Sequence, residues 1–381
     1  MQDTAPQPAS QNAFAAIADW IRLEQASGVG CRTASLLLDA FGSPAAIFRA
    51  GHAALAAHVP AAQASSLSAP VAPELARLLD ATHAWLAQPD HHILTLHDPG
   101  YPEALRHIPD PPLLLYINGR RELLGAPMVA VVGSRNASVQ GQANAQAFAQ
   151  ALSEAGLCVV SGMALGIDTA AHEGALRGPG STIAVTGTGQ DRVYPARNRA
   201  LAHRIAETGC IVSEYALGTP PVANNFPRRN RIISGMSAGV LVIEAAAQSG
   251  SLITAQMAAE QGREVFALPG SIHSALAKGC HQLIREGARL VETVDEVLDA
   301  MRVSPLIAPA RGPAQAMPDD TMDDSGALLA ALGHHPVAPD ELLVRIGGDA
   351  ASLAGALLAL ELAGLVERLP GGQVQRVVRV A

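Results

Sequence analysis

Hydrophobic residues between positions 91 and 303 form short, nearly continuous apolar runs that alternate with longer amphipathic stretches. Such runs are typical of strands buried on both faces, and the stretches between them are typical of helices. The pattern predicts an α/β fold in which helices cover both faces of a parallel sheet. The expected strands read HHILTL, LLLYING, MVAVVGS, CVVSG, STIAVTG, CIVSEY, GVLVIEA and EVFALPG, and the expected helices cover 139–155, 168–176, 197–208 and 252–262.

The hydrophobic pattern changes on both sides of this region. Residues 13–89 read as a domain of short helices, the first two joined by Ser27-Gly28-Val29-Gly30. This turn is either that of a helix-hairpin-helix, whose exposed N–H groups can bind a phosphate, or that of a plain helical hairpin. Residues 324–381 read as three helices, 325–332, 339–346 and 350–363, followed by a hairpin. That order is typical of a winged helix.

A chain of 381 residues is too long for one ordinary core, so two or three domains are expected. Residues 1–12 are predicted to be a disordered tail, and 304–323, rich in proline, alanine and acidic residues, a linker. The predicted domains are therefore 13–89, 90–303 and 324–381.

The net charge of −8 argues against a protein that coats nucleic acid over its whole surface. Residues 190–231 nevertheless contain seven arginines against three acids, which allows a local basic face. The four scattered cysteines form no C-x-x-C motif, so neither a disulfide framework nor a zinc site is expected. The N-terminus lacks the pattern of a signal peptide, and no apolar run is long enough for a membrane span. A soluble, cytoplasmic protein is predicted.

Small and polar residues follow the expected strands. Ligands of open α/β sheets bind at the carboxyl ends of the strands, and small residues let the backbone approach a phosphate there. Three such turns are candidates, although any tight turn between a strand and a helix favours glycine. They are Gly133-Ser134-Arg135, the loop from Ser161-Gly162 to Gly166, and Ser249-Gly250-Ser251.

The segment FPRRNR is the strongest candidate for ligand contact. Phe226 and Pro227 predict the start of a helix, and Arg228, Arg229, Asn230 and Arg231 follow in its first turns. Guanidinium groups suit bidentate phosphate contacts. A solvated helix face is the alternative, but we expect at least two of the three arginines to contact a ligand.

Common cofactor and catalytic motifs are missing from the sequence. There is no G-x-G-x-x-G after a strand, no P-loop and no H-E-x-x-H. Asp168 and His172 lie four residues apart on an expected helix, but an acidic helix start and an ordinary histidine explain them better than a metal does. Glu244 is the best carboxylate for acid–base work, yet it has no identifiable partner. No cofactor, no metal and no catalytic residue are predicted.

Several motifs together resemble the DprA or Smf family, the DNA processing protein A of bacterial natural transformation. The matching segments are VAVVGSRNAS, SGMALGIDTAAHEGAL, TGTGQDRVYPARNRAL, the stretch from SEYALGTPP to FALPG, and KGCHQLIREGA. The resemblance is dense over about 90–303. The flanks are similar to the family's sterile-alpha-motif-like and winged-helix domains, with weaker motifs. The resemblance implies an extended Rossmann fold in the centre.

The resemblance also implies a role without catalysis. Members of the family bind incoming single-stranded DNA, shield it from nucleases, load the recombinase RecA onto it and act as dimers. Guanidinium groups and loop amides would then hold phosphates, while Phe226 or an arginine plane stacks a base. The residues carried over by position are Arg135 with its glycine and serine neighbours, the SGMALGID loop, Phe226, Arg228 to Arg231, Ser249 to Ser251, and Lys278.

One feature of the C-terminal domain differs from what a helix that reads duplex DNA requires. The expected third helix of the winged-helix domain, DAASLAGALLALELAG, contains no lysine or arginine, whereas a major-groove helix needs basic or amide side chains. Protein contact or weak duplex binding is therefore expected of this domain. Two rivals to the leading interpretation remain: a duplex-binding regulator, and a nucleotide-processing Rossmann enzyme of the lysine-decarboxylase-like group. That group has a P-G-G-x-G-T loop, where this chain has Pro269-Gly270-Ser271-Ile272.

Overall fold

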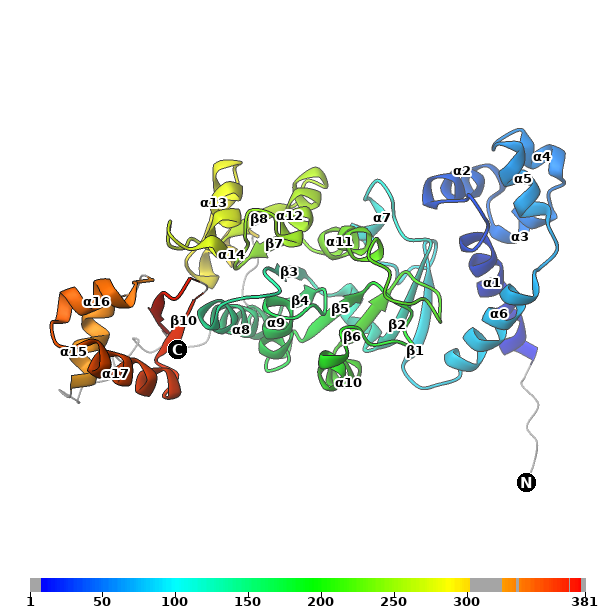
Figure 1. The fold of residues 1–381 in the computed structure, drawn as a ribbon. Helices are drawn as coiled ribbons and strands as arrows, with labels where there is room; N and C mark the ends of the chain where they lie inside the picture. Colours follow the sequence, from blue (N-terminus) through cyan, green and yellow to red (C-terminus); the bar gives the residue numbers. More distant parts are fainter. Residues whose placement is uncertain (1–7, 302–323, 334–335, 370, 378–381) are drawn as a thin grey trace, which may run out of the picture. The chain divides into compact units, whose positions relative to one another are not determined.

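The computed structural model describes residues 8–301, 324–333, 336–369 and 371–377. These residues form two compact units, whose helices and strands are labelled in Figure 1. Unit 1 combines Met1–Ala126 with Thr182–Ser237, and unit 2 combines Pro127–Ser181 with Ala238–Ala381. The α/β region of the sequence thus contributes strands and helices to both units.

Unit 1 begins with the helical region that the sequence predicts. Gly28, with φ +77°, turns the chain before α2, in a backbone conformation that favours glycine. Residues 1–7 of the expected tail lie outside the described residues, and α1 begins at Pro8. The helices are α1 (Pro8–Glu24), α2 (Cys31–Phe41), α3 (Pro44–Arg49), α4 (His52–Ala56), α5 (Ala61–Ser68) and α6 (Pro73–Leu86).

The strands of unit 1 are arranged in the order β1-β2-β6-β5. Here β5 (Thr182–Thr186) and β6 (Cys210–Ser213) are parallel, whereas β2 (Leu114–Gly119) pairs antiparallel with both β6 and β1 (His91–Thr95). The expectation of a parallel sheet is wrong for β1 and β2. The segment that joins them contains only the four-residue helix α7 (Glu103–Arg106), not the longer crossover helix that usually joins parallel neighbours.

Two further helices complete unit 1. Helix α10 (Arg199–Thr208) precedes β6, and α11 (Asn225–Met236) follows it and begins with the NFPRRNR segment. Two short 3₁₀ helices, Arg121–Gly125 and Ala196–Asn198, lie in the connections.

Unit 2 contains only parallel strand pairs in its α/β part, in the order β4-β3-β7-β8-β9. The strands are β3 (Met128–Val132), β4 (Cys158–Ser161), β7 (Gly239–Val242), β8 (Glu264–Ala267) and β9 (Arg289–Leu290). The sequence pattern missed β9, which has two residues, both exposed. The helices are α8 (Val139–Glu154), α9 (Ile167–Ala175), α12 (Gly250–Glu260), α13 (Lys278–Arg285) and α14 (Val294–Ala300), with a 3₁₀ turn at Ala275–Ala277.

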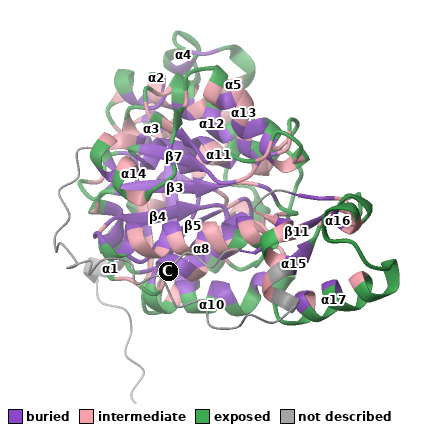
Figure 2. Ribbon diagram, turned by 90° about the vertical axis from the view of Figure 1, so that its left-hand side faces the viewer, coloured by how far each residue is buried: buried purple, intermediate pink, exposed green. Residues whose placement is uncertain are grey.

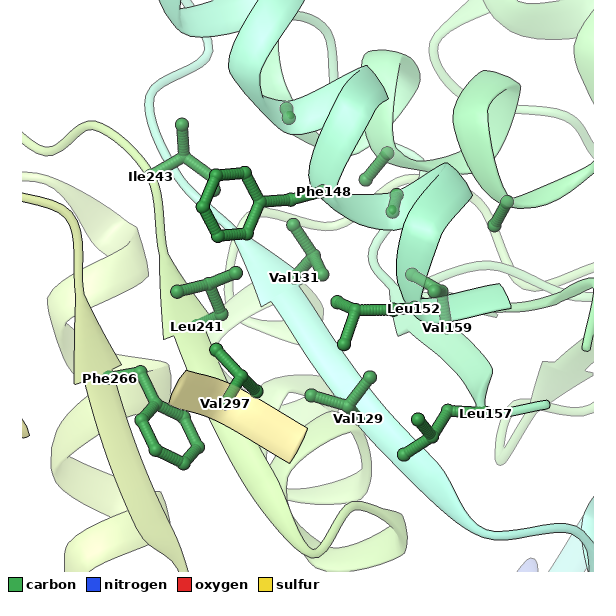
Figure 3. Packing of buried hydrophobic residues seen from close by; sticks show 14 of the residues in the cluster. Val129, Val131, Phe148, Leu152, Leu157, Val159, Leu241, Ile243, Phe266 and Val297 are labelled. Carbon is green, nitrogen blue, oxygen red and sulfur yellow. The ribbon is translucent and has the colours of Figure 1, made fainter. Parts of the chain in front are cut away.

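The core of unit 2 is built mainly from aliphatic side chains, as expected of a chain with 3% aromatic residues. Phe148 and Leu152 of α8 lie over Val131 of β3, next to Leu241 of β7 (Figure 3). Every residue of β3, β4 and β7 is buried, and Figure 2 shows these strands in purple. This buried sheet fixes the strand ends from which the candidate loops extend.

The C-terminal part of unit 2 has the order predicted for a winged helix. Helices α15 (Asp324–Leu332), α16 (Pro339–Ile346) and α17 (Ala350–Leu362) precede the antiparallel hairpin of β10 (Val366–Arg368) and β11 (Val374–Arg376). They enclose a separate apolar cluster that includes Leu342, Leu357 and Val374. The expected linker, 304–323, lies outside the described residues.

Within the described ranges, no single helix is long and apolar enough to cross a membrane. Helices α16 and α17 meet the length and composition criteria only when they are taken together, across a bend of 110°.

Candidate functional site

The loops after β3, β4 and β7 in unit 2 meet at the carboxyl ends of three neighbouring strands, as the sequence predicts. The amide of Ser134 donates to the carbonyl of Glu244 at 2.7 Å, and the amide of Ile167 donates to the carbonyl of Ser134 at 3.1 Å. A Cβ atom on Gly166 would lie 2.3 Å from that same Ser134 oxygen. The three loops are therefore packed into one another, and Gly166 is required for this approach.

The GSR turn presents one exposed side chain, that of Arg135. Gly133 is enclosed, because a Cβ there would lie 2.6 Å from Cγ1 of Ile167 and 2.8 Å from the carbonyl oxygen of Glu244. Ser134 is buried, and its hydroxyl accepts a hydrogen bond from the amide of Asn136 at 3.2 Å. Gly133 and Ser134 hold the turn in shape, and Arg135 is the residue that faces solvent.

Two amides of the SGMALGID loop already donate hydrogen bonds to a carboxylate of the same chain. The carboxylate of Asp168 accepts hydrogen bonds from the amides of Gly162 at 3.1 Å and Ala164 at 3.2 Å. The amide of Met163 donates to Nε2 of His172, and the hydroxyl of Ser161 donates to the carbonyl of Val131. The sequence predicted that these amides could bind a phosphate. It did not predict that Asp168 would reach back to them, although an acid at the start of α9 is the pattern from which such a contact could be suspected.

The QSGS turn and Lys278 complete the predicted residues of unit 2. Ser249 caps α12 by accepting from the amide of Ser251, and the two hydroxyl oxygens are 2.7 Å apart. Ser251 is buried and Gly250 is exposed. Lys278 is exposed at the start of α13, where its ammonium group donates to the carbonyl of Ile272.

Two carboxylates meet at the start of α8, just after the GSR turn. Glu244 accepts hydrogen bonds from the amide of Ser138 at 3.0 Å and from its hydroxyl at 2.6 Å. Glu367, on strand β10 of the winged helix, accepts from the amides of Val139 at 2.6 Å and Gln140 at 3.1 Å. Burial raises the pKa of Glu244 and the charge of Glu367 adds to this, while the bonds from Ser138 oppose it. Glu244 therefore serves as a helix-start acceptor in this structure.

In unit 1, two of the three predicted arginines of α11 point into the protein. Arg229 and Arg231 are only 4% and 7% exposed. Arg229 donates to the carbonyl of Val185, and Arg231 donates to the carboxylate of Glu214. Nε of Arg231 also lies 3.5 Å from the carboxylate of Asp110. These contacts favour packing roles for Arg229 and Arg231.

Arg228 is the exposed arginine of this helix. Its side chain is 51% exposed, and its Nη2 lies 3.6 Å from Oε2 of the buried Glu214. Burial raises the pKa of Glu214, and the charges of Arg231 and Arg228 oppose that rise. Asn230, the fourth polar residue of the segment, is half-buried.

Phe226 lies at the first turn of α11, where neighbouring residues fix its position. A Cβ on Gly187 would lie 3.1 Å from Cδ1 of Phe226, so glycine leaves room for the ring. The side chain of Asn225 donates to the carbonyl of Gly187 at 3.1 Å. The ring of Tyr194 lies 5.3 Å from that of Phe226, centroid to centroid, at an interplanar angle of 38°. Tyr194 is not among the site residues predicted from the sequence, since nothing in the pattern around it shows that it is exposed.

The chain is similar to two protein-family models and to several known proteins. The model of the DNA recombination-mediator protein A family matches residues 92–302, and that of the DprA winged helix domain matches residues 312–372. Protein Smf of Escherichia coli strain K12 is 41% identical over 301 residues, covering 78% of this chain and 80% of the relative. DNA processing protein DprA of Streptococcus pneumoniae is 51% identical over 201 residues, covering 53% of this chain and 71% of the relative.

Solved structures agree with these matches. The X-ray structure of DprA from Streptococcus pneumoniae has a TM-score of 0.60 and 38% identity, covering 74% of this chain and 97% of that one. A structure of the Helicobacter pylori protein, described by its single-stranded DNA binding mode, has a TM-score of 0.51 and 30% identity, covering 55% and 96%. The family models, the relatives and the solved structures agree, and the chain belongs to the DprA/Smf family of DNA recombination-mediator proteins.

Proposed function

We propose that this protein binds single-stranded DNA as a recombination mediator, protects incoming transforming DNA and loads RecA onto it. The observation that carries the proposal is the exposed guanidinium of Arg228 two residues after Phe226 at the start of α11, a helix in which Arg229 and Arg231 are buried. An exposed cation and an aromatic ring at the start of one helix supply the two kinds of group that bind phosphate and base with little sequence readout. The Helicobacter pylori relative, whose structure is described by its single-stranded DNA binding mode, supports this assignment.

The predicted site residues take two kinds of role in this proposal. Arg228 and Phe226 of unit 1 contact the strand directly, with Asn230 as a further polar contact. In unit 2 the exposed groups at the loop ends, Arg135 and Lys278, contact phosphates, and Gly250 beside Ser249 allows the backbone to approach the strand. Gly133 and Gly166 let the loops pack against one another. The buried members hold these groups in place, namely Ser134, Ser161, Gly162, Arg229, Arg231 and Ser251.

The proposal assigns no turnover to the protein. Among the described residues, no group of three or more His, Cys, Asp or Glu side chains is placed to hold a metal ion. Glu244 is engaged by Ser138, as expected of a structural acceptor. ATP hydrolysis would belong to RecA. A homodimer acting in the cytoplasm, with predicted domains at 13–89, 90–303 and 324–381, completes the proposal.

Duplex reading is not assigned to the winged helix. Its third helix, α17, carries no lysine or arginine, and exposed positions such as Leu358 and Leu362 are apolar. A helix that reads base edges in a major groove needs basic or amide side chains, which α17 lacks.

Binding to single strand, duplex and mononucleotide at two salt concentrations tests the proposal. We expect labelled oligothymidine to bind far more tightly than duplex of the same length, and to weaken as salt rises, because phosphate contacts release counterions. Equal affinity for both, or no affinity for single strand, would contradict it. Mononucleotide binding that resists salt, accompanied by product formation, would instead favour the nucleotide-processing enzyme.

The finer part of the proposal needs its own assay. RecA filament formation is followed on a long single strand that is already coated with a single-strand-binding protein. We expect this protein to shorten the lag before filaments grow. An unchanged lag, in a preparation that binds single strand normally, would remove RecA loading from the proposal and leave DNA binding intact.

A further inference from the structure

Tyr194 differs from the other large aromatic side chains of this protein. The chain has only two tryptophans, four tyrosines and six phenylalanines. Among the described residues, Tyr194 is the one member of this set in the exposed class, with 48% of its surface accessible. Tyr101 and Tyr116, by comparison, are 2% and 0% exposed. A protein with few aromatic residues thus leaves one large ring in water, directly beside Phe226.

The loop that carries Tyr194 is held by hydrogen bonds on both sides of the ring. The hydroxyl of Thr188 donates to the carbonyl of Arg192 at 2.9 Å, and the carboxylate of Asp191 accepts from the amide of Gly218 at 2.8 Å. After the ring, the amide of Asn198 donates to the carbonyl of Pro195 at 3.0 Å. The exposed ring is therefore presented by an ordered turn, and a ligand that stacks on it does not have to order the loop first.

The charges on this loop suit a nucleic acid. Arg192 and Arg197, two residues before and three after Tyr194, are both exposed, and Arg192 has Asp191 3.7 Å away as an ion-pair partner. Arg228 is exposed two residues after Phe226 in the sequence. Aromatic rings interleaved with arginines are the arrangement that takes successive bases of a single strand, with phosphates on the cations.

We propose that Tyr194 is a second base-stacking side chain beside Phe226, and that the loop 188–197 belongs to the single-strand-binding surface. This inference rests on the proposed function and adds a residue and a loop that the sequence analysis did not include. The ligand it names is an unpaired base, whose flat face packs on the exposed tyrosine ring. A second base packs against Phe226, so two neighbouring bases of the strand are held.

The test compares Tyr194→Ala, Tyr194→Phe and the wild type on oligothymidine. Stacking on one aromatic residue contributes about 1–3 kcal/mol, so Tyr194→Ala should weaken binding by about 5- to 150-fold. Tyr194→Phe should bind nearly as the wild type, because the ring face is kept. The slope of log affinity against log salt should stay unchanged in both variants, since no phosphate contact is lost.

An oligonucleotide with abasic positions separates stacking from every other effect of the substitution. On this ligand the wild type and Tyr194→Ala should bind alike, because there is no base to stack. Val71→Ala, at an exposed position (45%) outside the loop 188–197, is the control and should change neither affinity. Thermal unfolding of each variant checks that the fold is kept.

Two results would overturn the inference while the proposed function stands. One is wild-type affinity of Tyr194→Ala for oligothymidine. The other is an equal loss on normal and abasic strands, which would indicate a contact that does not involve bases. If the wild type itself fails to bind single strand, the proposed function fails first and the role of Tyr194 fails with it.

Discussion

Helix α11 in unit 1 and the strand-end loops in unit 2 offer positive charge in different ways. Helix α11 has side-chain cations, two of which are buried on the acceptors Val185, Glu214 and Asp110, while Arg228 faces outward. The loops of unit 2 have backbone amides, and carboxylates of the same unit hold several of them. A sequence rich in arginine or in glycine therefore indicates where groups with positive potential are located. The structure shows how many of these groups contact acceptors within the protein.

This difference between the two units indicates which residues to substitute. In unit 1, two arginines of α11 are buried and one is exposed. Substitution of a buried arginine should therefore lower stability, and substitution of the exposed one should weaken DNA binding. In unit 2, the glycines are needed for close packing, and acidic residues carry much of the framework. Substituting the acids should therefore reveal more about unit 2 than substituting its glycines.

The largest effect is expected from Arg231→Ala. Its side chain is 8% exposed and that of Glu214 is 5% exposed, so the substitution leaves a buried carboxylate without its nearest cation. Breaking a buried pair from one side costs about 3–5 kcal/mol of unfolding free energy. Urea unfolding measures this. Arg228→Ala is the matched control and should cost no more than about 1 kcal/mol; equal losses in the two variants would erase the distinction within the helix.

Arg228→Ala should show its effect in DNA binding. Loss of a charge-assisted contact to phosphate costs about 1.5–3 kcal/mol, which corresponds to roughly 10- to 150-fold in affinity for oligothymidine. The slope of log affinity against log salt should fall in magnitude by about 0.7, the value for one phosphate of a single strand. Arg77→Ala, which removes an exposed arginine on α6, controls for the change in net charge. An unchanged slope would remove Arg228 from the proposed surface.

Asp168→Ala tests whether a carboxylate organises the loops of unit 2. The substitution removes the acceptor that the amides of Gly162 and Ala164 share, and we expect a loss of about 1–3 kcal/mol in stability. Asp168→Asn keeps one acceptor oxygen and should lose less. Hydrogen exchange at the two amides, followed by mass spectrometry, should accelerate in the alanine variant. Unchanged exchange would mean that other contacts order the loop.

The smallest effect concerns pH and the start of α8. The pKa of Glu244 is raised above its ordinary value of 4.5, so the folded state holds the proton more tightly than the unfolded state. The stability from this difference is fully present below about pH 4.5 and is lost as the pH rises through the folded pKa. Glu367→Gln removes a neighbouring negative charge and should therefore lower that pKa.

The melting temperature of the Glu367→Gln variant should consequently fall less between pH 4.5 and neutrality than that of the wild type. Glu361→Gln, which removes the exposed partner of Arg368 in the winged helix, is the control and should leave the pH dependence unchanged. Parallel curves for the wild type and Glu367→Gln would show that the two carboxylates do not influence each other.

Much of the fold could be predicted from the sequence because buried strands leave a strong local signal. All eight expected strands are present, since each contains several apolar residues in succession. Strand β9 was missed because its two residues are exposed and make no such run. The antiparallel direction of β1 and β2 was missed because apolar content does not report direction.

The candidate site was predictable in its location and less so in the roles of its residues. The motifs located the loops and the start of α11. The burial of Arg229 and Arg231 depends on acceptors far away in the sequence, Asp110, Val185 and Glu214, which no local pattern identifies. The contact of Glu367 with α8 joins residues 228 positions apart, so the pattern around either residue could not indicate it.

The carboxylate of Asp168 has a further consequence for the thermodynamics of binding. Because it holds the amides of the loop after β4 from within the chain, we expect that loop to keep one shape whether or not an external anion is present. Ordering a flexible residue costs roughly 1–2 kcal/mol, and here this cost is met during folding instead of at the encounter with a ligand. A partner that binds at these strand ends should therefore lose little binding free energy to the ordering of this loop.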